Sequence, residues 1–199
     1  MLKRAFDVFF SAGALLVLSP LLLAVAVWVR LDSVGPIFFR QCRVGREGRE
    51  FDIFKFRTMA GDASIRGPQI TVGSDARITR CGEFLRKYKI DEFPQFINVL
   101  LGDMSVVGPR PEVPRFVALY PSETRAVVLS VRPGITDLAS IEYRDENALL
   151  GRSADPESAY VNEVMPAKLA YCERYVRERS FVGDLSIIKR SFAASFSRR

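Results

Sequence analysis

Histidine is absent from the 199-residue sequence, and only three cysteines are present. Without histidine the chain lacks the commonest general base, the usual partner of serine and cysteine nucleophiles, and a ligand of most zinc sites. Cys42, Cys81 and Cys172 lie far apart and form no Cys-x-x-Cys pair, so we expect reduced thiols that serve as packing residues. Chemistry must therefore come from carboxylates, lysine, arginine, hydroxyl groups, the backbone or a hard metal ion.

Glycine-rich nucleotide-binding loops are also missing. The sequence contains neither a G-x-G-x-x-G nor a Walker A motif, and it shows no internal repeat or low-complexity tract. Its length suits one domain with its own core. The formal net charge of +6 favours an anionic partner, namely nucleic acid, lipid headgroups or a phosphorylated substrate.

Charged residues are absent from positions 8–29, "VFFSAGALLVLSPLLLAVAVWV". A helix of this length rises roughly 33 Å, about the thickness of a bilayer's hydrocarbon core. We therefore predict a membrane helix and divide the chain into an anchor, 1–34, and a body, 35–199. A cleavable signal peptide is a weaker alternative, because the apolar run is too long for an h-region and no A-x-A site follows it.

Ser19 and Pro20 interrupt the middle of this segment. Pro20 lacks an N–H and crowds the carbonyl of Leu16, so we expect a kink, with the Ser19 hydroxyl as a partner for that carbonyl. Basic residues flank both ends of the segment. They are Lys3 and Arg4 before it, and Arg30, Arg40, Arg43, Arg46 and Arg49 after it.

The positive-inside rule places both of these flanks in the cytoplasm. A bent helix that enters and leaves the membrane by one face satisfies the rule, whereas a straight spanning helix does not. Charge alone leaves a second topology open, because a tilted spanning helix with a proline kink is also common.

The body begins with two runs rich in phenylalanine and isoleucine around a basic glycine turn, which predicts a β-hairpin over 36–59. Residues 60–80 are rich in Gly, Asp and Pro and predict a loop. Thr79 is expected to cap a helix over roughly 80–89. A further helix should follow Pro94 and end at Gly102.

The C-terminal part predicts two amphipathic helices. The first covers roughly 166–178, and the second lies in the final segment, 180–199, with Phe, Leu and Ile on one side and Lys and Arg on the other. Basic amphipathic helices often lie in the headgroup plane of anionic lipid. A helix that packs on the core and ends in a solvated tail remains an open alternative.

Asp91 and Glu92 stand side by side in "KYKIDEFPQF", residues 87–96. Pro94 fits only the first turn of the following helix, so we place the two acids at a helix N-terminus, where free N–H groups favour anions. Taken alone, an N-cap Asp and a first-turn Glu are ordinary features of a helix. Neighbouring basic residues favour an anion pocket with the two carboxylates at its centre. They are Arg86, Lys87 and Lys89 upstream, Arg110 in "VVGPRPE", Arg132 in "VRPGI" and Arg144 in "SIEYRDEN".

Four motifs, in this order, carry a family resemblance: "KRAFDVFFSAGALLVLSPLLL", "FKFRTM", "KIDEFPQFINVLLGDMSVVGPRP" and "RPGIT". Together they cover nearly the whole chain and closely resemble the bacterial sugar transferases, specifically the small monotopic phosphoglycosyl transferases. The resemblance implies transfer of a sugar 1-phosphate from a UDP-sugar to polyprenol phosphate, usually undecaprenyl phosphate, with release of UMP and with Mg²⁺ as cofactor. Such a step would start the assembly of O-antigen, capsule, exopolysaccharide or glycoprotein glycans.

The resemblance also implies roles for single residues. Asp91 corresponds to the nucleophile that forms a covalent phosphosugar intermediate, and Glu92 to the acid associated with Mg²⁺. Lys55 and Arg86 correspond to residues near phosphate, and the Ser19–Pro20 pair to the break of a re-entrant helix. The expected substrate-binding residues are Lys55, Arg57, Arg86, Arg110, Arg132 and Arg144.

The expected fold is α+β and helix-dominated. A re-entrant membrane helix kinked at Ser-Pro, a β-hairpin and surface amphipathic helices should surround a cytosolic catalytic core, 35–199. We expect it on the cytoplasmic face of the bacterial inner membrane, in contact with lipid and without a nucleic-acid partner; homodimer formation stays open. Only one apolar segment is present, so we expect the minimal catalytic form.

One segment departs from the family pattern. After "RPGIT" many relatives continue with Gly-Trp, whereas this chain continues with "DLASIEYRDEN". We expect residues 136–147 to line the nucleotide-sugar site, so the identity of the sugar is not predicted. Two other functions remain as alternatives: a conventional nucleotide-sugar glycosyltransferase, which would release UDP, and a non-catalytic membrane scaffold, which would tolerate Asp91→Asn.

Overall fold

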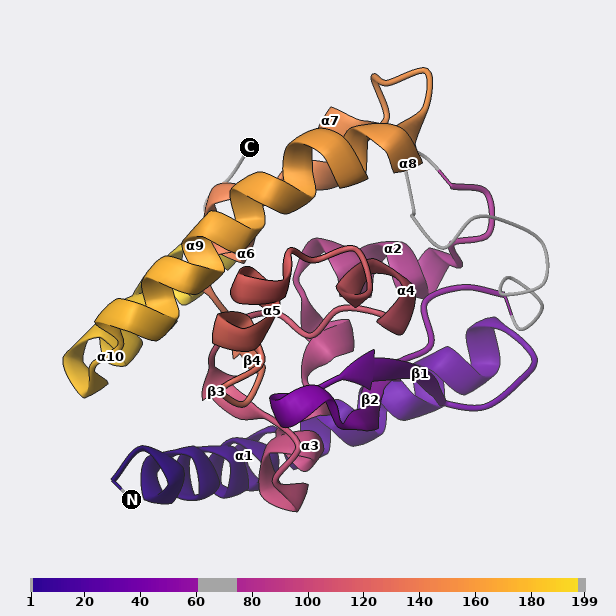
Figure 1. The fold of residues 1–199 in the computed structure, drawn as a ribbon. Coiled ribbons are helices and arrows are strands. Elements are labelled where there is room, and N and C mark those ends of the chain that lie inside the picture. The colour runs from indigo at the N-terminus through magenta and orange to yellow at the C-terminus, as the bar shows by residue number, and fades with distance from the viewer. Residues whose placement is uncertain (1, 61–74, 197–199) are drawn as a thin grey trace.

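The structure is a computed structural model that describes residues 2–60 and 75–196. Within these residues helices dominate and the strands form two small two-stranded sheets (Figure 1), which confirms the expected helix-rich α+β class. Most of the loop predicted over 60–80 lies outside the described residues.

Helix α1 (Leu2–Asp32) contains 31 residues and runs along one edge of the molecule (Figure 1). Its length and composition are sufficient to cross a membrane. Leu16 and Val17, near its middle, are 76% and 77% exposed. The Ser19 hydroxyl donates to the Leu16 carbonyl at 2.8 Å, which confirms the predicted partner, and the helical backbone continues through Pro20.

The N-terminal end of α1 is joined to the body by polar contacts. Arg4 donates from NH1 to the carbonyl of Val99 at 2.7 Å. The carboxylate of Asp7 accepts from the Ser105 hydroxyl at 2.8 Å and from the Val106 N–H at 3.1 Å. Because these partners belong to the body, the start of α1 cannot move independently of it.

The C-terminal end of α1 is joined to the same body by apolar packing. Val25 and Val29 are buried in one cluster with Phe56, Cys81 and Leu85. Both ends of α1 therefore contact the body, while apolar side chains between them remain exposed.

A hairpin follows α1. Strands β1 (Phe38–Val44) and β2 (Glu50–Phe56) pair antiparallel around a short 3-10 turn (Arg46–Gly48), as the sequence predicted. The register sets Lys55 opposite Phe39. The hairpin brings Lys55 to the middle of the molecule because the far edge of β2 packs against later segments of the chain.

Helix α2 (Arg80–Lys87) starts where the sequence predicted. The Thr79 side chain accepts from the Gly82 N–H at 3.0 Å and caps the helix. The helix is two residues shorter than expected, because Lys89 adopts a left-handed conformation with φ of 59°. Helix α3 (Gln95–Leu101) follows and ends at Gly102, whose φ of 100° suits glycine.

The second sheet is parallel and joins strands β3 (Ser105–Val107) and β4 (Gly134–Thr136). Helices α4 (Pro114–Val117) and α5 (Ser122–Val128) lie in the connection between them. The sheet brings the "VVGPRPE" and "VRPGI" motifs side by side, although about 25 residues separate them in sequence.

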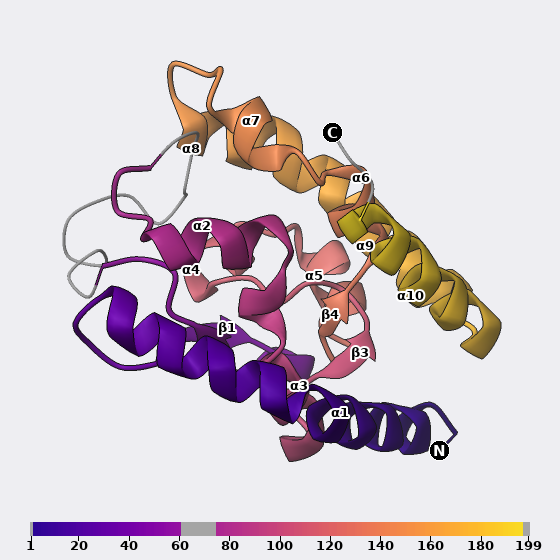
Figure 2. The ribbon, with the colours of Figure 1, turned by 180° about the vertical axis from the view of Figure 1, so that it is seen from behind.

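Helices form the C-terminal layer, and the two predicted amphipathic helices are present as α9 and α10 (Figure 2). Helix α10 packs on the body through the buried Ile187 and Asp184. Lys3 of α1 contacts the Asp184 carboxylate at 2.6 Å, so the two helices meet at one end of the molecule. The elements in this layer are α6 (Leu138–Glu142), α7 (Glu146–Leu150), α8 (Pro156–Ala159), a π-helical turn (Tyr160–Val164), α9 (Met165–Glu178) and α10 (Phe181–Phe196).

The described cysteines are free thiols, as expected. Cys81 and Cys172 are buried packing residues, whereas Cys42 is half-buried on the hairpin.

Candidate active site

The two adjacent carboxylates lie in a single 3-10 turn (Ile90–Glu92) that begins after Lys89. The N–H of Glu92 donates to the carbonyl of Lys89, and the N–H of Phe93 to that of Ile90, both at 3.2 Å. These bonds complete a separate tight turn directly before α3, so Asp91 and Glu92 lie at the N-terminal side of that helix, where the sequence placed them. Pro94 separates the turn from α3, where its missing N–H breaks no helical bond.

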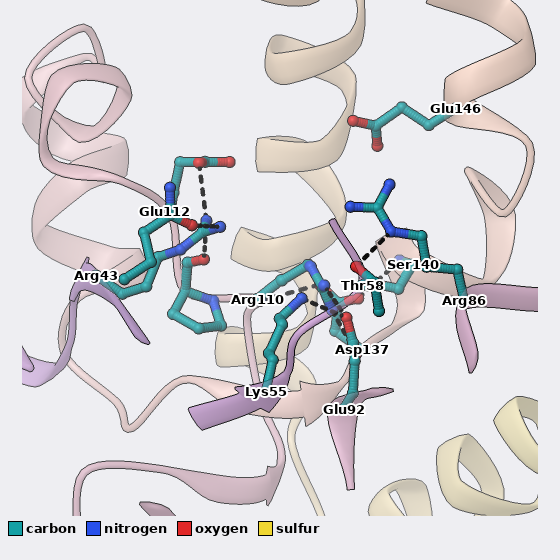
Figure 3. A network of polar contacts seen from close by, with 12 residues as sticks. Arg43, Lys55, Thr58, Arg86, Glu92, Arg110, Glu112, Asp137, Ser140 and Glu146 are labelled. Carbon is teal, nitrogen blue, oxygen red and sulfur yellow. Dashed lines mark hydrogen bonds and ion pairs between the residues drawn. The ribbon is translucent and has the colours of Figure 1, made fainter. Parts of the chain in front are cut away.

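Glu92 is bound by two cations from different parts of the chain (Figure 3). Lys55 contacts Oε1 at 2.8 Å, and Arg110 reaches Oε2 from NH1 at 3.1 Å and Oε1 from NH2. Burial by itself would raise the pKa of Glu92, but the charges of Arg110 and Lys55 hold that pKa well below its ordinary value. Glu92 is therefore an ionised acid inside the protein.

The pKa values of Lys55 and Arg110 shift in opposite directions in this environment. Burial lowers the pKa of Lys55, and the charge of Glu92 opposes that effect. The charge of Glu92 raises the pKa of Arg110 above its ordinary value, although burial acts against it. Two cations around one carboxylate leave a net positive charge, which suits the binding of phosphate.

Asp91 differs from Glu92 in its hydrogen bonding and in the direction of its pKa shift. The residue is 7% exposed, and its Oδ1 has no hydrogen-bond partner among the described residues. Burial raises the pKa of Asp91, and the negative charge of Glu92 raises it further. A buried carboxylate with an unpaired oxygen is costly to keep, and such groups are concentrated at functional sites.

Helix α2 supplies a third cation to this region. Arg86 donates from Nε to the Thr58 hydroxyl at 2.9 Å (Figure 3), and its positive charge lowers the pKa of Asp91 against the effect of burial. Burial lowers the pKa of Arg86, and Asp91 opposes this change. The structure thus brings three predicted basic residues, Lys55, Arg86 and Arg110, to the carboxylates.

Arg110 is held by the segment that follows β4. Its backbone N–H donates to Oδ2 of Asp137 at 3.2 Å, and Oδ1 of Asp137 accepts from the Ser140 N–H at 2.7 Å, which caps α6. Asp137 lies in the segment 136–147 that we expected to line the nucleotide-sugar site, but it was not singled out from the sequence. An aspartate directly before the helix-forming "LASIE" is an N-cap pattern that points to it.

Two glycines bring Arg110 into place. A Cβ at Gly134 would lie 2.1 Å from the backbone nitrogen of Gly108, and a Cβ at Gly108 would lie 2.5 Å from the Arg132 carbonyl oxygen. Only glycine allows this contact between the two motifs, which fixes the chain two residues before Arg110.

Arg57 is placed away from the carboxylates. Its NH2 group donates to the carbonyls of Val29 at 3.1 Å and Ser33 at 2.6 Å, at the C-terminal end of α1. Helix C-terminal carbonyls are unpaired and attract cations. Arg57 thus secures the end of α1 and has no described contact with Asp91 or Glu92, so its expected role in substrate binding stays a prediction.

Arg132 and Arg144 also bind carbonyl groups near helix ends. Arg132 donates from Nε to the carbonyl of Gly102 at 2.8 Å, and Arg144 donates from NH1 to that of Ala194 at 2.8 Å. Neither has a described contact with the carboxylates. The structure therefore does not bring these two predicted residues to the site.

A second, half-buried polar cluster lies near Arg110 (Figure 3). Glu112 accepts from NH1 of Arg43 at 3.2 Å, as Figure 3 shows. It also accepts from the hydroxyl of Tyr160 at 2.6 Å, which joins the hairpin to the π-helical turn. Burial lowers the pKa of Arg43, and Glu112 opposes this effect. No local sequence pattern singles out these residues, because their partners lie far away in the chain.

The site consists of two buried carboxylates among cations, in a body that carries a long exposed apolar helix. The helix is long and apolar enough to associate with a membrane, and the cations around the carboxylates suit an anionic ligand. The bacterial sugar transferase family matches residues 1–198, and the chain belongs to this family.

Curated relatives agree with this assignment. The chain is 44% identical over 189 residues to the UDP-N-acetylgalactosamine-undecaprenyl-phosphate N-acetylgalactosaminephosphotransferase of Aeromonas hydrophila, covering 94% of this chain and 42% of that protein. It is 37% identical over 191 residues to the UDP-glucose:undecaprenyl-phosphate glucose-1-phosphate transferase of Escherichia coli K12, covering 94% and 39%. The chain therefore spans less than half the length of these two relatives.

A third relative is similar in length to this chain. The exopolysaccharide production protein PSS of Rhizobium leguminosarum bv. phaseoli is 40% identical over 206 residues, which cover all of this chain and 96% of that protein.

Proposed function

We propose that this protein is a phosphoglycosyl transferase that moves a sugar 1-phosphate from a UDP-sugar to undecaprenyl phosphate and releases UMP. The observation that carries the proposal is Asp91, a buried carboxylate with an unpaired oxygen beside a cation-bound Glu92. The printed names of the Aeromonas and Escherichia relatives describe transfer to undecaprenyl phosphate, which supports the same activity here. The product would start the assembly of a bacterial glycoconjugate.

The first step is attack by Asp91. A carboxylate oxygen forms a bond to the phosphorus that carries the sugar, and the bond from that phosphorus to the bridging oxygen breaks. UMP leaves with the bonding electron pair, and the sugar phosphate remains on Asp91 as a mixed anhydride. Burial of Asp91 favours this step, because the attacking carboxylate has no hydrogen bond at Oδ1 to give up.

The second step regenerates the enzyme. A phosphate oxygen of the polyprenyl phosphate attacks the same phosphorus, and the bond to Asp91 breaks, which returns the carboxylate and gives a polyprenyl diphosphate sugar. One nucleophile serves both substrates in turn, so the donor and acceptor can share one small site. Lys55 and Arg110 supply positive charge to the phosphates in both steps.

Mg²⁺ is the proposed cofactor, and the residues present fit it. Magnesium binds one or two carboxylates together with phosphate oxygens and water. The ionised Glu92, the predicted metal ligand, has acceptor positions beyond those used by Lys55 and Arg110. The described residues contain no cluster of three or more metal-ligating side chains, so substrate phosphates would complete the shell. When bound, the ion neutralises phosphate charge.

We also propose a re-entrant topology, with the anchor at 1–34 and the catalytic domain at 35–199 on the cytoplasmic face of the inner membrane. A helix that crosses the bilayer separates its ends by about 30 Å of hydrocarbon. Here one body contacts Asp7 near the start of α1 and Val29 near its end, which supports the placement of both ends on one side. The exposed apolar middle of α1 would enter the lipid.

The nucleotide product tests the reaction. Purified full-length protein is incubated with undecaprenyl phosphate, Mg²⁺ and a panel of UDP-sugars, and the released nucleotide is identified by chromatography. We expect UMP with at least one sugar. Release of UDP would instead identify a conventional glycosyltransferase.

The intermediate has its own test. Protein quenched with donor present and acceptor withheld should gain the mass of one sugar phosphate, and peptide mapping should place it on Asp91. Asp91→Asn should gain nothing, whereas the control Asp103→Asn, at the other end of α3, should be labelled as wild type is. An unlabelled wild-type protein that still releases UMP would rule out the covalent step.

Topology is tested by cysteine labelling in a Cys42→Ser background, which removes the half-buried native thiol. Single cysteines introduced before Lys3 and after Arg30 should both react only from the cytoplasmic side. Reaction from opposite sides would establish a spanning helix.

A further inference from the structure

Asn98 is a fully buried residue of α3, with 0% of its surface exposed. Its Oδ1 accepts from the N–H of Phe54 at 2.9 Å, and its Nδ2 donates to the carbonyl of Asp52 at 2.8 Å. Strand β1 pairs with one edge of β2, and the Asn98 amide occupies the other edge. The side chain thus satisfies two backbone groups of β2 as a neighbouring strand would.

The same two segments are joined a second time at the carboxylates. Lys55 follows Phe54 directly in β2, and its Nζ contacts Glu92 at 2.8 Å. Glu92 precedes α3, which carries Asn98. Residues at the two ends of one short stretch, 92–98, therefore hold adjacent parts of one strand.

This arrangement makes the register of β2 important for the site. Side chains alternate between the two faces of a strand, so a slip of one residue would turn Lys55 away from Glu92. Apolar packing of one face of β2 against α3 already opposes such a slip. The two hydrogen bonds of Asn98 add a directional constraint, because a slip of one residue would remove both of them.

We propose that Asn98 is a positioning residue for the transfer reaction: its amide fixes β2 against α3 and thereby sets Lys55 on Glu92. The consequence for catalysis rests on the function proposed above, whereas the placement of Lys55 does not. Asparagine is required because the site needs one donor and one acceptor. Aspartate keeps the acceptor for Phe54 but sets a carboxylate oxygen against the carbonyl of Asp52.

A double-mutant cycle tests the inference. Asn98→Asp, Lys55→Met and the double variant are compared by kcat/KM for UMP release. We expect Asn98→Asp alone to lose about 10- to 100-fold, because small misplacements at an active site are costly. In the Lys55→Met background the same change should have less than about a 3-fold effect, since residues that act through one contact are not additive. Additive losses would overturn the proposal.

A second readout does not depend on activity. Modification of Lys55 by an amine reagent is followed by mass spectrometry relative to the exposed Lys189. Asn98→Asp should raise the relative rate at Lys55 several-fold, because Glu92 no longer holds the amine. An unchanged rate would overturn the proposal. If the rate at Lys55 rises in Asn98→Asp but the wild-type protein releases no UMP with any UDP-sugar, the proposed function alone is refuted.

Val164→Ala separates positioning from loss of stability. Val164 is buried in a different apolar cluster, so its truncation destabilises the fold without touching β2. This control should leave Lys55 modification unchanged and act additively with Lys55→Met. If Asn98→Asp does not fold, Asn98→Ser, which keeps one hydroxyl for the strand edge, enters the same cycle with the same expected signs.

Discussion

Two aspartates show how differently this protein treats its buried charges. Asp7, at the start of α1, is 2% exposed, and its two carboxylate oxygens accept from the Ser105 hydroxyl and the Val106 N–H. Asp91 is 7% exposed, and its Oδ1 accepts nothing among the described residues. Residue type and burial are similar, so the two aspartates differ in their hydrogen bonds. The carboxylate of Asp7 is hydrogen-bonded and holds a helix, whereas Oδ1 of Asp91 is left free to react.

The neighbouring acids extend this comparison. Asp184, beside the start of α1, binds the Lys3 amine and accepts from the neutral Tyr175 hydroxyl at 2.9 Å. Glu92 binds two cations, Lys55 and Arg110. Asp184 thus has one cationic partner, whereas Glu92 has two, and a phosphate can use the additional positive charge beside Glu92.

The largest expected effect comes from Asp91→Asn. Turnover should fall by at least about 10³-fold, because an amide is a poor nucleophile. The same change should raise the free energy of unfolding by about 1 kcal/mol, since it removes a costly buried carboxylate. UMP release and thermal unfolding in detergent measure the two effects, with Asp103→Asn as the control. Near-normal turnover would contradict the assignment of the nucleophile.

Arg110→Met should have the next largest effect. It leaves Glu92 with one cation instead of two, and we expect turnover to fall about 10²-fold, as for loss of one charged donor at a transition state. Arg132→Met is the matched control, because Arg132 binds a helix carbonyl and should change kcat by less than about 3-fold. A similar loss of turnover in both variants would contradict the inference that Arg110 acts at the carboxylates and Arg132 does not.

Asp7→Ala should act on stability and leave the chemistry intact. It removes two hydrogen bonds and leaves a buried N–H without a partner, so we expect a loss of about 2–4 kcal/mol in the free energy of unfolding. Urea denaturation in detergent measures this loss, and kcat per folded molecule should stay unchanged. A stable variant would refute the anchoring role.

The smallest expected effect is in pH dependence. The pKa of Asp91 is raised, so kcat/KM should fall on the acid side at a pH above that of an ordinary aspartate, because the protonated acid cannot attack. A raised carboxyl pKa also means that stability is lost as pH rises through it. The stability gain of Asp91→Asn should therefore grow over the same pH range. An equal gain at all pH values would contradict this explanation.

Local patterns in the sequence predicted the elements with short-range causes. The hairpin, the Thr79 cap and the end of α3 at Gly102 each depend on neighbouring residues, and each is present. The adjacent pair Asp91 and Glu92 was visible for the same reason. The 3-10 turn that holds this pair was not predicted, because the left-handed Lys89 ends α2 early and starts a separate turn.

Long-range contacts explain what the sequence did not reveal. An arginine in a basic stretch has the same local pattern whether it binds a phosphate or a helix carbonyl, so Arg57 and Arg132 could not be told from Arg110. Asp7 lies 98 residues from its partner Ser105, and Asn98 lies 44 residues from Phe54. Only the packed structure brings such partners together.

The close approach of Gly108 and Gly134 has a consequence for engineering. Bare backbone sets the spacing of the two motifs, and any side chain at either position would force them apart. A mutational library intended to retarget the protein to another sugar should therefore leave these two codons invariant. Diversity is better placed after Asp137, because the chain has then left the glycine contact and the aspartate that holds Arg110 is kept.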